Sequence, residues 1–165
     1  MKNFIASMVA AITMSFTIAA TAEPVHPVKF PKEYRRWTHV KSMVIFDSKH
    51  PLFGAFAGIH HVYVNDSAYK AMTEKTDYPK GATFAFDLLE IKESNGAYVE
   101  GGRKFIAVME RDADKYKDTQ GWAWQVFVKG NPKELGVADR AAQKACATCH
   151  LEVGAQHFVF TNWRP

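Results

Sequence analysis

The chain has 165 residues, of which 47% are hydrophobic and 23% charged, so it has the composition of one folded domain and not of a disordered protein. Its formal net charge of +4 comes from basic residues scattered among acidic ones, which gives no clustered basic face for nucleic acid. Aromatic residues make up 13% of the chain, which suits either an aromatic core or a fold wrapped around a large flat group.

The N-terminal segment has the pattern of a secretory signal. Lys2 precedes an apolar stretch from Phe4 to Ala20, and Ala20-Thr21-Ala22 is a small-x-small cleavage site. A membrane anchor is the less favoured interpretation, because the stretch is short for a span of about 20 residues and is diluted by Ser and Thr. We expect residues 1–22 to be a cleaved signal peptide, residues 23–165 to form a single domain, and the mature protein to be periplasmic without membrane contact.

The rest of the chain is expected to be rich in strands. Residues 23–36 hold prolines and charged residues and predict an extended lead-in. Phe84, Phe86 and Leu88 recur with a period of two, which places them on one face of a sheet. Runs of Val, Ile, Met and aromatic residues predict strands at residues 37–46, 59–64, 82–91, 105–110 and 122–129.

Turn and cap signals connect these runs. Residues 52–58 predict an apolar loop or short helical turn, and Asn65-Asp66-Ser67 can cap a short helix that ends near residue 75. Asn95-Gly96 predicts a hairpin, and Gly101-Gly102 predicts a break in the strand that follows.

A final helix is expected over residues 140–148, because Asp139 can cap a run of alanines and long polar residues. Helices do not alternate with strands, which excludes a parallel α/β fold. The predicted fold class is therefore mainly antiparallel β (α+β), a single-domain β meander with short helices and a C-terminal helix.

The strongest motif is Cys146-Ala147-Thr148-Cys149-His150, which contains the only two cysteines of the chain. Cys-x-x-Cys-His is the attachment signature of c-type haem. Two thiols one helical turn apart can reach the two vinyl groups of the porphyrin, and the adjacent imidazole can bind the iron. The motif predicts one haem c, attached through two thioethers to Cys146 and Cys149, with His150 as the metal ligand on the C-terminal haem-binding helix.

Other chemistries of a cysteine pair fit the sequence less well. A thioredoxin-like pair would begin a helix after a strand, whereas this pair comes at the end of the predicted helix. A zinc site would need further ligands, of which His157 is a candidate, and no second cysteine pair exists. A disulfide between Cys146 and Cys149 is the remaining alternative.

A sixth ligand for the iron is not singled out by any motif. Electron-transfer cytochromes c bring a methionine or a second histidine to the far side of the haem. On a strand His60 and His61 point to opposite faces, so at most one of them could approach it. The candidates are Met43, Met72, Met109, His60 and His61.

Several segments resemble those of the beta-type cytochromes c′. Together with the terminal Cys-x-x-Cys-His motif they span nearly all of the mature chain. The cytochromes c′-beta share their fold with the hydroxylamine-oxidising cytochromes whose haem is cross-linked to a lysine, and the resemblance implies a mostly antiparallel β protein and a homodimer. The segments are Trp37-Thr38-His39-Val40-Lys41-Ser42-Met43, Gly58-Ile59-His60-His61-Val62-Tyr63-Val64-Asn65, Tyr78-Pro79-Lys80-Gly81-Ala82 and Gly121-Trp122.

The resemblance also implies which residues face the far side of the haem. Aligned without gaps from Gly81-Ala82, Phe86 stands where the lysine-cross-linked enzymes carry their lysine. Two phenylalanines cap the distal face in the cytochromes c′-beta, and they correspond to Phe56 and Phe86. Lys80 and Lys92 lie close enough to this position to be the alternative residues for such a cross-link. If the register slips, the capping residues are Phe53 and Phe84.

A haem with His150 below the iron and phenyl rings above it would be five-coordinate. Such a site binds NO and CO, which develop little charge, and disfavours anions because its distal side is apolar. The expected function is therefore gas binding, in scavenging or sensing. A hydroxylamine- or NO-oxidising haem enzyme is one alternative, and it would need a distal proton acceptor and the lysine cross-link. A periplasmic electron carrier is the other, and it would need an exposed haem edge.

Overall fold

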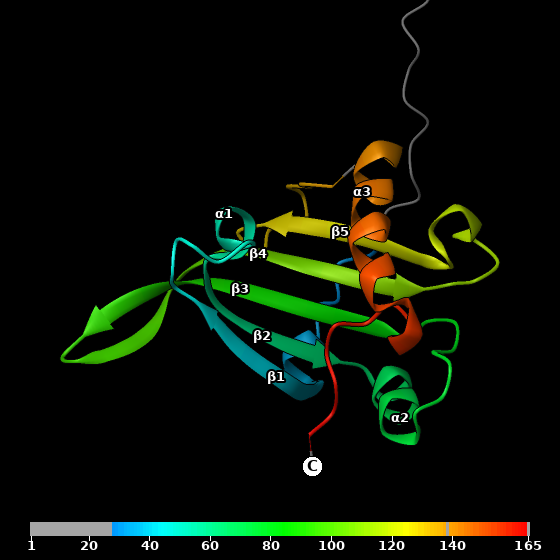
Figure 1. Ribbon diagram of the computed structural model, residues 1–165, viewed down its shortest axis with the longest axis horizontal. Coiled ribbons are helices and arrows are strands. Elements are labelled where there is room, and N and C mark those ends of the chain that lie inside the picture. The colour runs from blue at the N-terminus through cyan, green and yellow to red at the C-terminus, as the bar shows by residue number, and fades with distance from the viewer. Residues whose placement is uncertain (1–27, 138, 165) are drawn as a thin grey trace, which may run out of the picture.

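The computed structural model describes residues 28–137 and 139–164 (Figure 1). The predicted signal peptide, residues 1–22, lies outside the described residues. Within the described part of the chain, no helix is both long enough and apolar enough to cross a membrane.

A single antiparallel sheet organises the described chain, with its strands in sequence order from edge to edge. Each strand pairs antiparallel with the next, so the predicted meander and fold class are confirmed. Four of the five predicted strands are found within three residues of their expected bounds, and the strand expected at residues 105–110 begins earlier, at Ala97. The strands are β1 (Thr38–Ile45), β2 (Gly58–Val64), β3 (Thr83–Ser94), β4 (Ala97–Arg111) and β5 (Trp122–Val128).

Short helices connect and cover the strands, and two of them begin at the expected caps. The Asn65 side chain accepts a hydrogen bond from the Ala68 amide at 3.1 Å, and that of Asp139 accepts one from the Ala142 amide at 2.8 Å. The helices are α1 (Phe53–Phe56), α2 (Asp66–Glu74) and α3 (Arg140–His150), with 3₁₀ helices at Tyr34–Arg36, Lys117–Thr119 and Leu151–Gln156.

The β3–β4 hairpin is longer than the sequence predicted, because Gly101-Gly102 does not break β4. The register shifts on both sides of Leu89, the second time opposite Gly101-Gly102, and the two strands continue pairing to the Asn95-Gly96 turn. A Cβ atom at Gly101 would lie 2.9 Å from the Cβ of Glu90, so glycine allows close approach of the strands. The predicted break is wrong because the glycine pair serves an irregular strand pairing here.

The two faces of the sheet are covered by different parts of the chain. One face, which we call the helix-covered face, carries α2, α3 and the C-terminal segment (Figure 1). The opposite face packs against the lead-in, with Val28 and Tyr34 buried on it. The helix-covered face is formed by residues that alternate along the strands, among them Val62, Val64, Phe84, Phe86, Met109, Trp122 and Trp124.

Candidate haem site

Helix α3 is fixed to the edge of the sheet by one buried side chain. The Gln143 amide accepts a hydrogen bond from the backbone N–H of Trp124 at 2.9 Å and donates one to its carbonyl oxygen. β5 is an edge strand, so these backbone groups have no neighbouring strand on that side. The amide of Gln143 therefore takes the place of a strand and sets the position of the following turn of α3.

That turn presents the predicted motif to the helix-covered face. Positions 143, 146, 147 and 150 follow the helical period, and their side chains are all buried or half-buried. Cys146 packs against the core of this face, whereas Cys149 is exposed. Burial raises the pKa of the Cys146 thiol. Neither cysteine forms a disulfide in the structure, so both thiols are free.

His150 has a defined tautomer. Its Nδ1 atom lies 2.7 Å from the carbonyl oxygen of Phe158. A carbonyl oxygen only accepts hydrogen bonds, so Nδ1 carries the proton and Nε2 keeps its lone pair. Burial lowers the pKa of His150, against the smaller opposite effect of this hydrogen bond, and favours the neutral imidazole that binds metals. A metal-binding histidine is held in this way by a backbone carbonyl.

Two aromatic rings that the sequence analysis did not single out flank His150. The Trp124 ring centroid lies 5.1 Å from the His150 ring centroid, and the Phe160 ring centroid lies 5.0 Å from it. Trp124 comes from β5 and Phe160 from the C-terminal segment, so no local pattern links them to the motif. Phe160 remains 45% exposed.

Phe56 and Phe86 meet, as the resemblance implies. Their ring centroids are 5.7 Å apart, although they lie thirty residues apart on α1 and β3. The hydrogen bond from Lys104 Nζ to the carbonyl oxygen of Ala57, at 2.8 Å, ties the end of α1 to β4 and so positions Phe56. Phe105 of β4 completes a three-ring cluster, with its centroid 6.1 Å from Phe86 and 6.2 Å from Phe56.

The alternative capping ring on β3 and the two nearby lysines lie elsewhere. Phe84 is 5% exposed and packs against Tyr78 and Trp122 in the core. Lys80 lies in the turn before β3, where its Nζ pairs with Asp112 at 3.0 Å. Lys92 is six residues beyond Phe86 on β3, about 20 Å along a strand at about 3.3 Å per residue.

The candidates for a sixth ligand of the iron lie in different parts of the structure. Met72 and Met109 are buried in the core. His61 faces away from the helix-covered face, where its Nδ1 lies 2.7 Å from Ser42 Oγ and its Nε2 lies 2.5 Å from Glu100 Oε1. His60 lies on the helix-covered face, with its ring centroid 4.4 Å from that of Phe86. The prediction that the two histidines point to opposite faces is confirmed.

Two unpartnered nitrogens indicate that a further group belongs between α3 and the phenylalanine cluster. Among the described residues, the buried side-chain nitrogen or oxygen atoms without a hydrogen-bond partner are His60 Nδ1 and Trp124 Nε1. One adjoins Phe86 and the other adjoins His150, at the two sides of the candidate site. Free thiols, an imidazole with an available Nε2 and a cluster of phenyl rings all fit a haem.

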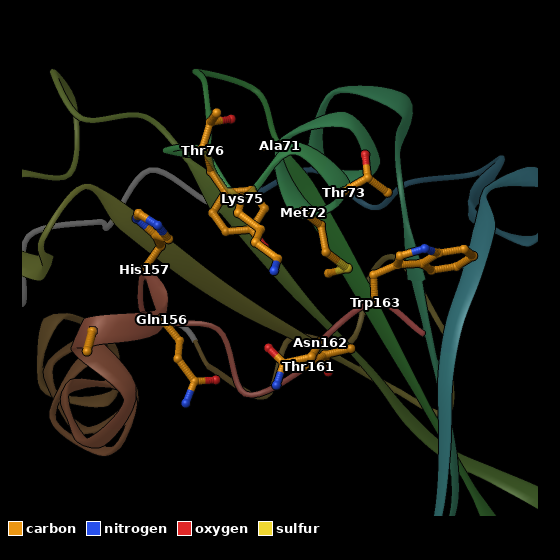
Figure 2. A pocket seen from close by; sticks show the side chains of 12 residues that line it. Ala71, Met72, Thr73, Lys75, Thr76, Gln156, His157, Thr161, Asn162 and Trp163 are labelled. Carbon is orange, nitrogen blue, oxygen red and sulfur yellow. The ribbon is translucent and has the colours of Figure 1, made fainter. Parts of the chain in front are cut away.

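A cavity elsewhere in the described part of the chain is separate from the candidate haem site. It measures about 590 Å³ and lies between α2 and the C-terminal segment, with Lys75 and Met72 on one side and Asn162 and Trp163 on the other (Figure 2). None of the predicted haem-binding residues lines it. His157, the candidate zinc ligand, borders it and pairs with Asp77 at 2.7 Å. The described residues contain no group of three His, Cys, Asp or Glu side chains arranged to hold a metal ion.

An antiparallel sheet that carries a Cys-x-x-Cys-His helix on one face, with the histidine Nε2 available, defines a β-sheet protein of the c-type haem class. The family model for Cytochrome P460 matches residues 31–161, so the chain belongs to this family. The family contains the cytochromes c′-beta and the lysine-cross-linked hydroxylamine-oxidising cytochromes, which confirms the resemblance and implies a c-type haem cofactor. No match to the chain is found among curated proteins.

Proposed function

We propose that the mature chain is an exported mono-haem c-type cytochrome that binds NO or CO at a five-coordinate iron, in gas scavenging or sensing. The observation that supports this best is the pair of features on one sheet face: a histidine whose Nε2 is left free by the Phe158 carbonyl, and a cluster of three phenyl rings. Residues 1–22 would direct export to the periplasm and be removed there.

In this proposal Cys146 and Cys149 hold the haem by two thioethers and His150 binds its iron. When bound, the haem supplies an iron atom that takes a small diatomic gas as ligand. The hydrogen bond to Phe158 keeps the His150 ring in one orientation and its neutral form available. Phe56 and Phe86 exclude water and offer no hydrogen bond, so uncharged diatomic gases are favoured over anions.

The electron carrier is the second candidate, and one observation favours it. Cys149 is exposed, Leu151 is 49% exposed, and Phe160, whose ring packs against His150, is 45% exposed. An exposed haem edge ringed by apolar side chains is suited to brief contact with a redox partner. Hydroxylamine oxidation is favoured less, since Phe86 occupies the strand position that the resemblance gives to the cross-linking lysine.

The proposed homodimer follows from the resemblance. Light scattering of the purified mature protein would measure its mass directly, and a mass of one chain would contradict the dimer.

Two measurements test the haem proposal. Because both thiols would be used in thioethers, haem should stay with the polypeptide through acid–acetone extraction and denaturing electrophoresis, and Cys146→Ser or Cys149→Ser should weaken this retention. Absorption and resonance Raman spectra of the ferrous protein should show a high-spin, five-coordinate iron. Haem that extracts from the wild type refutes covalent attachment, and a six-coordinate low-spin ferrous spectrum favours the electron carrier instead.

A further inference from the structure

His60 stands out as a polar residue in an apolar setting. Its side chain is on the helix-covered face of β2, and the residue is 4% exposed. Its cross-strand partners are Met43 on β1 and Leu88 on β3, neither of which offers a strong hydrogen-bonding group. Its Nδ1 atom is buried and has no hydrogen-bond partner among the described residues. Buried polar side chains are nearly always paired, so an unpaired one marks a functional role or a missing partner.

The ring of Phe86 covers this imidazole. The two centroids are 4.4 Å apart with planes inclined by 32°, so the phenyl ring is tilted over the histidine. Phe86 in turn contacts Phe56 and Phe105. His60 therefore packs directly against the proposed distal cap, on the same face of the sheet.

The charge state of His60 suits a hydrogen-bonding role. Burial, reinforced by the nearby His61 and Lys41, lowers its pKa to about 4. At neutral pH the ring is uncharged, and an uncharged imidazole has one nitrogen that donates and one that accepts. It can thus give a hydrogen bond to a polar ligand or take a proton from a protic one.

We propose that His60 is the hydrogen-bonding residue of the distal side, and that the Phe86 ring decides whether it can reach a ligand there. With the ring in place, the site favours NO and CO, which need no hydrogen-bond partner. With the ring displaced, the site accepts protic ligands, for which the imidazole is a partner. This inference rests on the haem site proposed above and names its specificity-determining pair.

The test is a double-mutant cycle on the purified holoprotein, with cyanide binding to the ferric form as the probe. Phe86→Ala should raise cyanide affinity by about two- to twelve-fold, the range of one hydrogen bond, or give a six-coordinate low-spin ferric spectrum if the imidazole reaches the iron itself. Adding His60→Phe should remove either effect. The change in cyanide affinity caused by His60→Phe should therefore be larger in the Phe86→Ala background than in the wild type, which is the signature of coupled residues.

His61→Phe is the matched control, since His61 is the adjacent residue and points to the opposite face. It should not couple to Phe86. If Phe86→Ala does not fold, Phe86→Leu removes the ring while keeping apolar volume and should shift cyanide affinity in the same direction. Additive effects of His60→Phe and the Phe86 variants would overturn the inference. A wild type without covalent haem, or with a low-spin six-coordinate ferrous iron, would refute the proposed function instead, so the two failures are distinguishable.

Discussion

The ring of Trp124 lies 5.1 Å from the ring of His150, while the backbone of the same tryptophan is bound by the side chain of Gln143. One residue of the edge strand thus fixes the helix two turns before the histidine and also packs against the histidine itself. The position of His150 relative to the sheet therefore depends on Gln143, which lies outside the Cys-x-x-Cys-His motif.

Gln143→Leu should destabilise the protein by about 2–4 kcal/mol, because the N–H and C=O of Trp124 would be left buried without partners. Urea unfolding of wild type and variant measures this difference. Lys144→Leu is the control, since Lys144 is the next residue of the same helix and is exposed. Equal losses in the two variants would show that Gln143 has no special role in holding α3.

His150→Ala should leave the haem attached to the polypeptide, because the two thioethers do not involve the imidazole. The ferric and ferrous spectra should change, and added imidazole should restore them towards the wild type, since Nε2 of the missing ring is the proposed ligand atom. His157→Ala is a suitable comparison because the His157 side chain pairs with Asp77 and not with a residue of the motif. Spectra of His150→Ala that match the wild type without imidazole would contradict this assignment.

Much of the fold could be predicted because its signals are local. Asn65 and Asp139 cap the helices that they were expected to cap, and Asn95-Gly96 makes the expected turn. The predicted break at Gly101-Gly102 was wrong. A glycine pair is compatible both with a break and with a close, irregular strand pairing, and the contact that distinguishes them here is with Glu90, on the other strand of the hairpin.

The candidate site could be predicted only where a motif or a resemblance marks it. Cys146, Cys149 and His150 stand in one recognisable run, and the resemblance indicated Phe56 and Phe86. The neighbours of these residues come from distant strands: Phe105 from β4, Trp124 from β5 and the Phe158 carbonyl from the C-terminal segment. Such contacts depend on sheet register and on the path of the last residues, which composition and periodicity do not specify.

Phe86→Ala should speed the binding of CO and NO, because the phenyl ring limits access to the distal side. The ring is only half-buried, so the loss of stability should be about 2 kcal/mol, below the range of about 3–5 kcal/mol for a fully buried phenylalanine. Phe84→Ala is the matched control: Phe84 is on the same strand and face but is packed between Tyr78 and Trp122. It should cost more stability and leave the rates unchanged, as measured by urea unfolding and by flash photolysis. Unchanged rates in Phe86→Ala would mean that Phe86 does not cap the site.

Phe86→Gln should have a different effect, since it places a hydrogen-bond donor where the apolar ring was. We expect O₂ or cyanide to bind more tightly by about two- to twelve-fold, the equivalent of about 0.5–1.5 kcal/mol for one neutral hydrogen bond. CO affinity should change less, because bound CO develops little charge. Ligand titrations followed by absorption measure both constants, and an equal change for CO and cyanide would indicate altered access alone.

The stability of the protein should fall in mildly acidic solution because of His60. Its pKa is lowered from 6.5 to about 4 in the folded state, mainly by burial, so the unfolded chain binds the proton more readily. Between these two pH values the unfolded state takes up more protons, and stability therefore rises with pH across this window and is lost as pH falls through it. The loss of unfolding free energy that is due to His60 reaches about 3 kcal/mol near pH 4. Other groups also titrate in this range, so the measurement is the difference between two proteins.

His60→Phe removes the group that titrates, so urea unfolding midpoints of this variant should decline less between pH 7 and pH 4.5 than those of the wild type. The variant should also gain stability relative to the wild type as the pH falls, because an apolar ring needs neither a proton nor a hydrogen-bond partner in the space next to Phe86. In His61→Phe the titrating imidazole of His60 is still present, so this control should keep most of the wild-type decline. Parallel pH profiles for wild type and His60→Phe would show that the buried imidazole is not the group responsible.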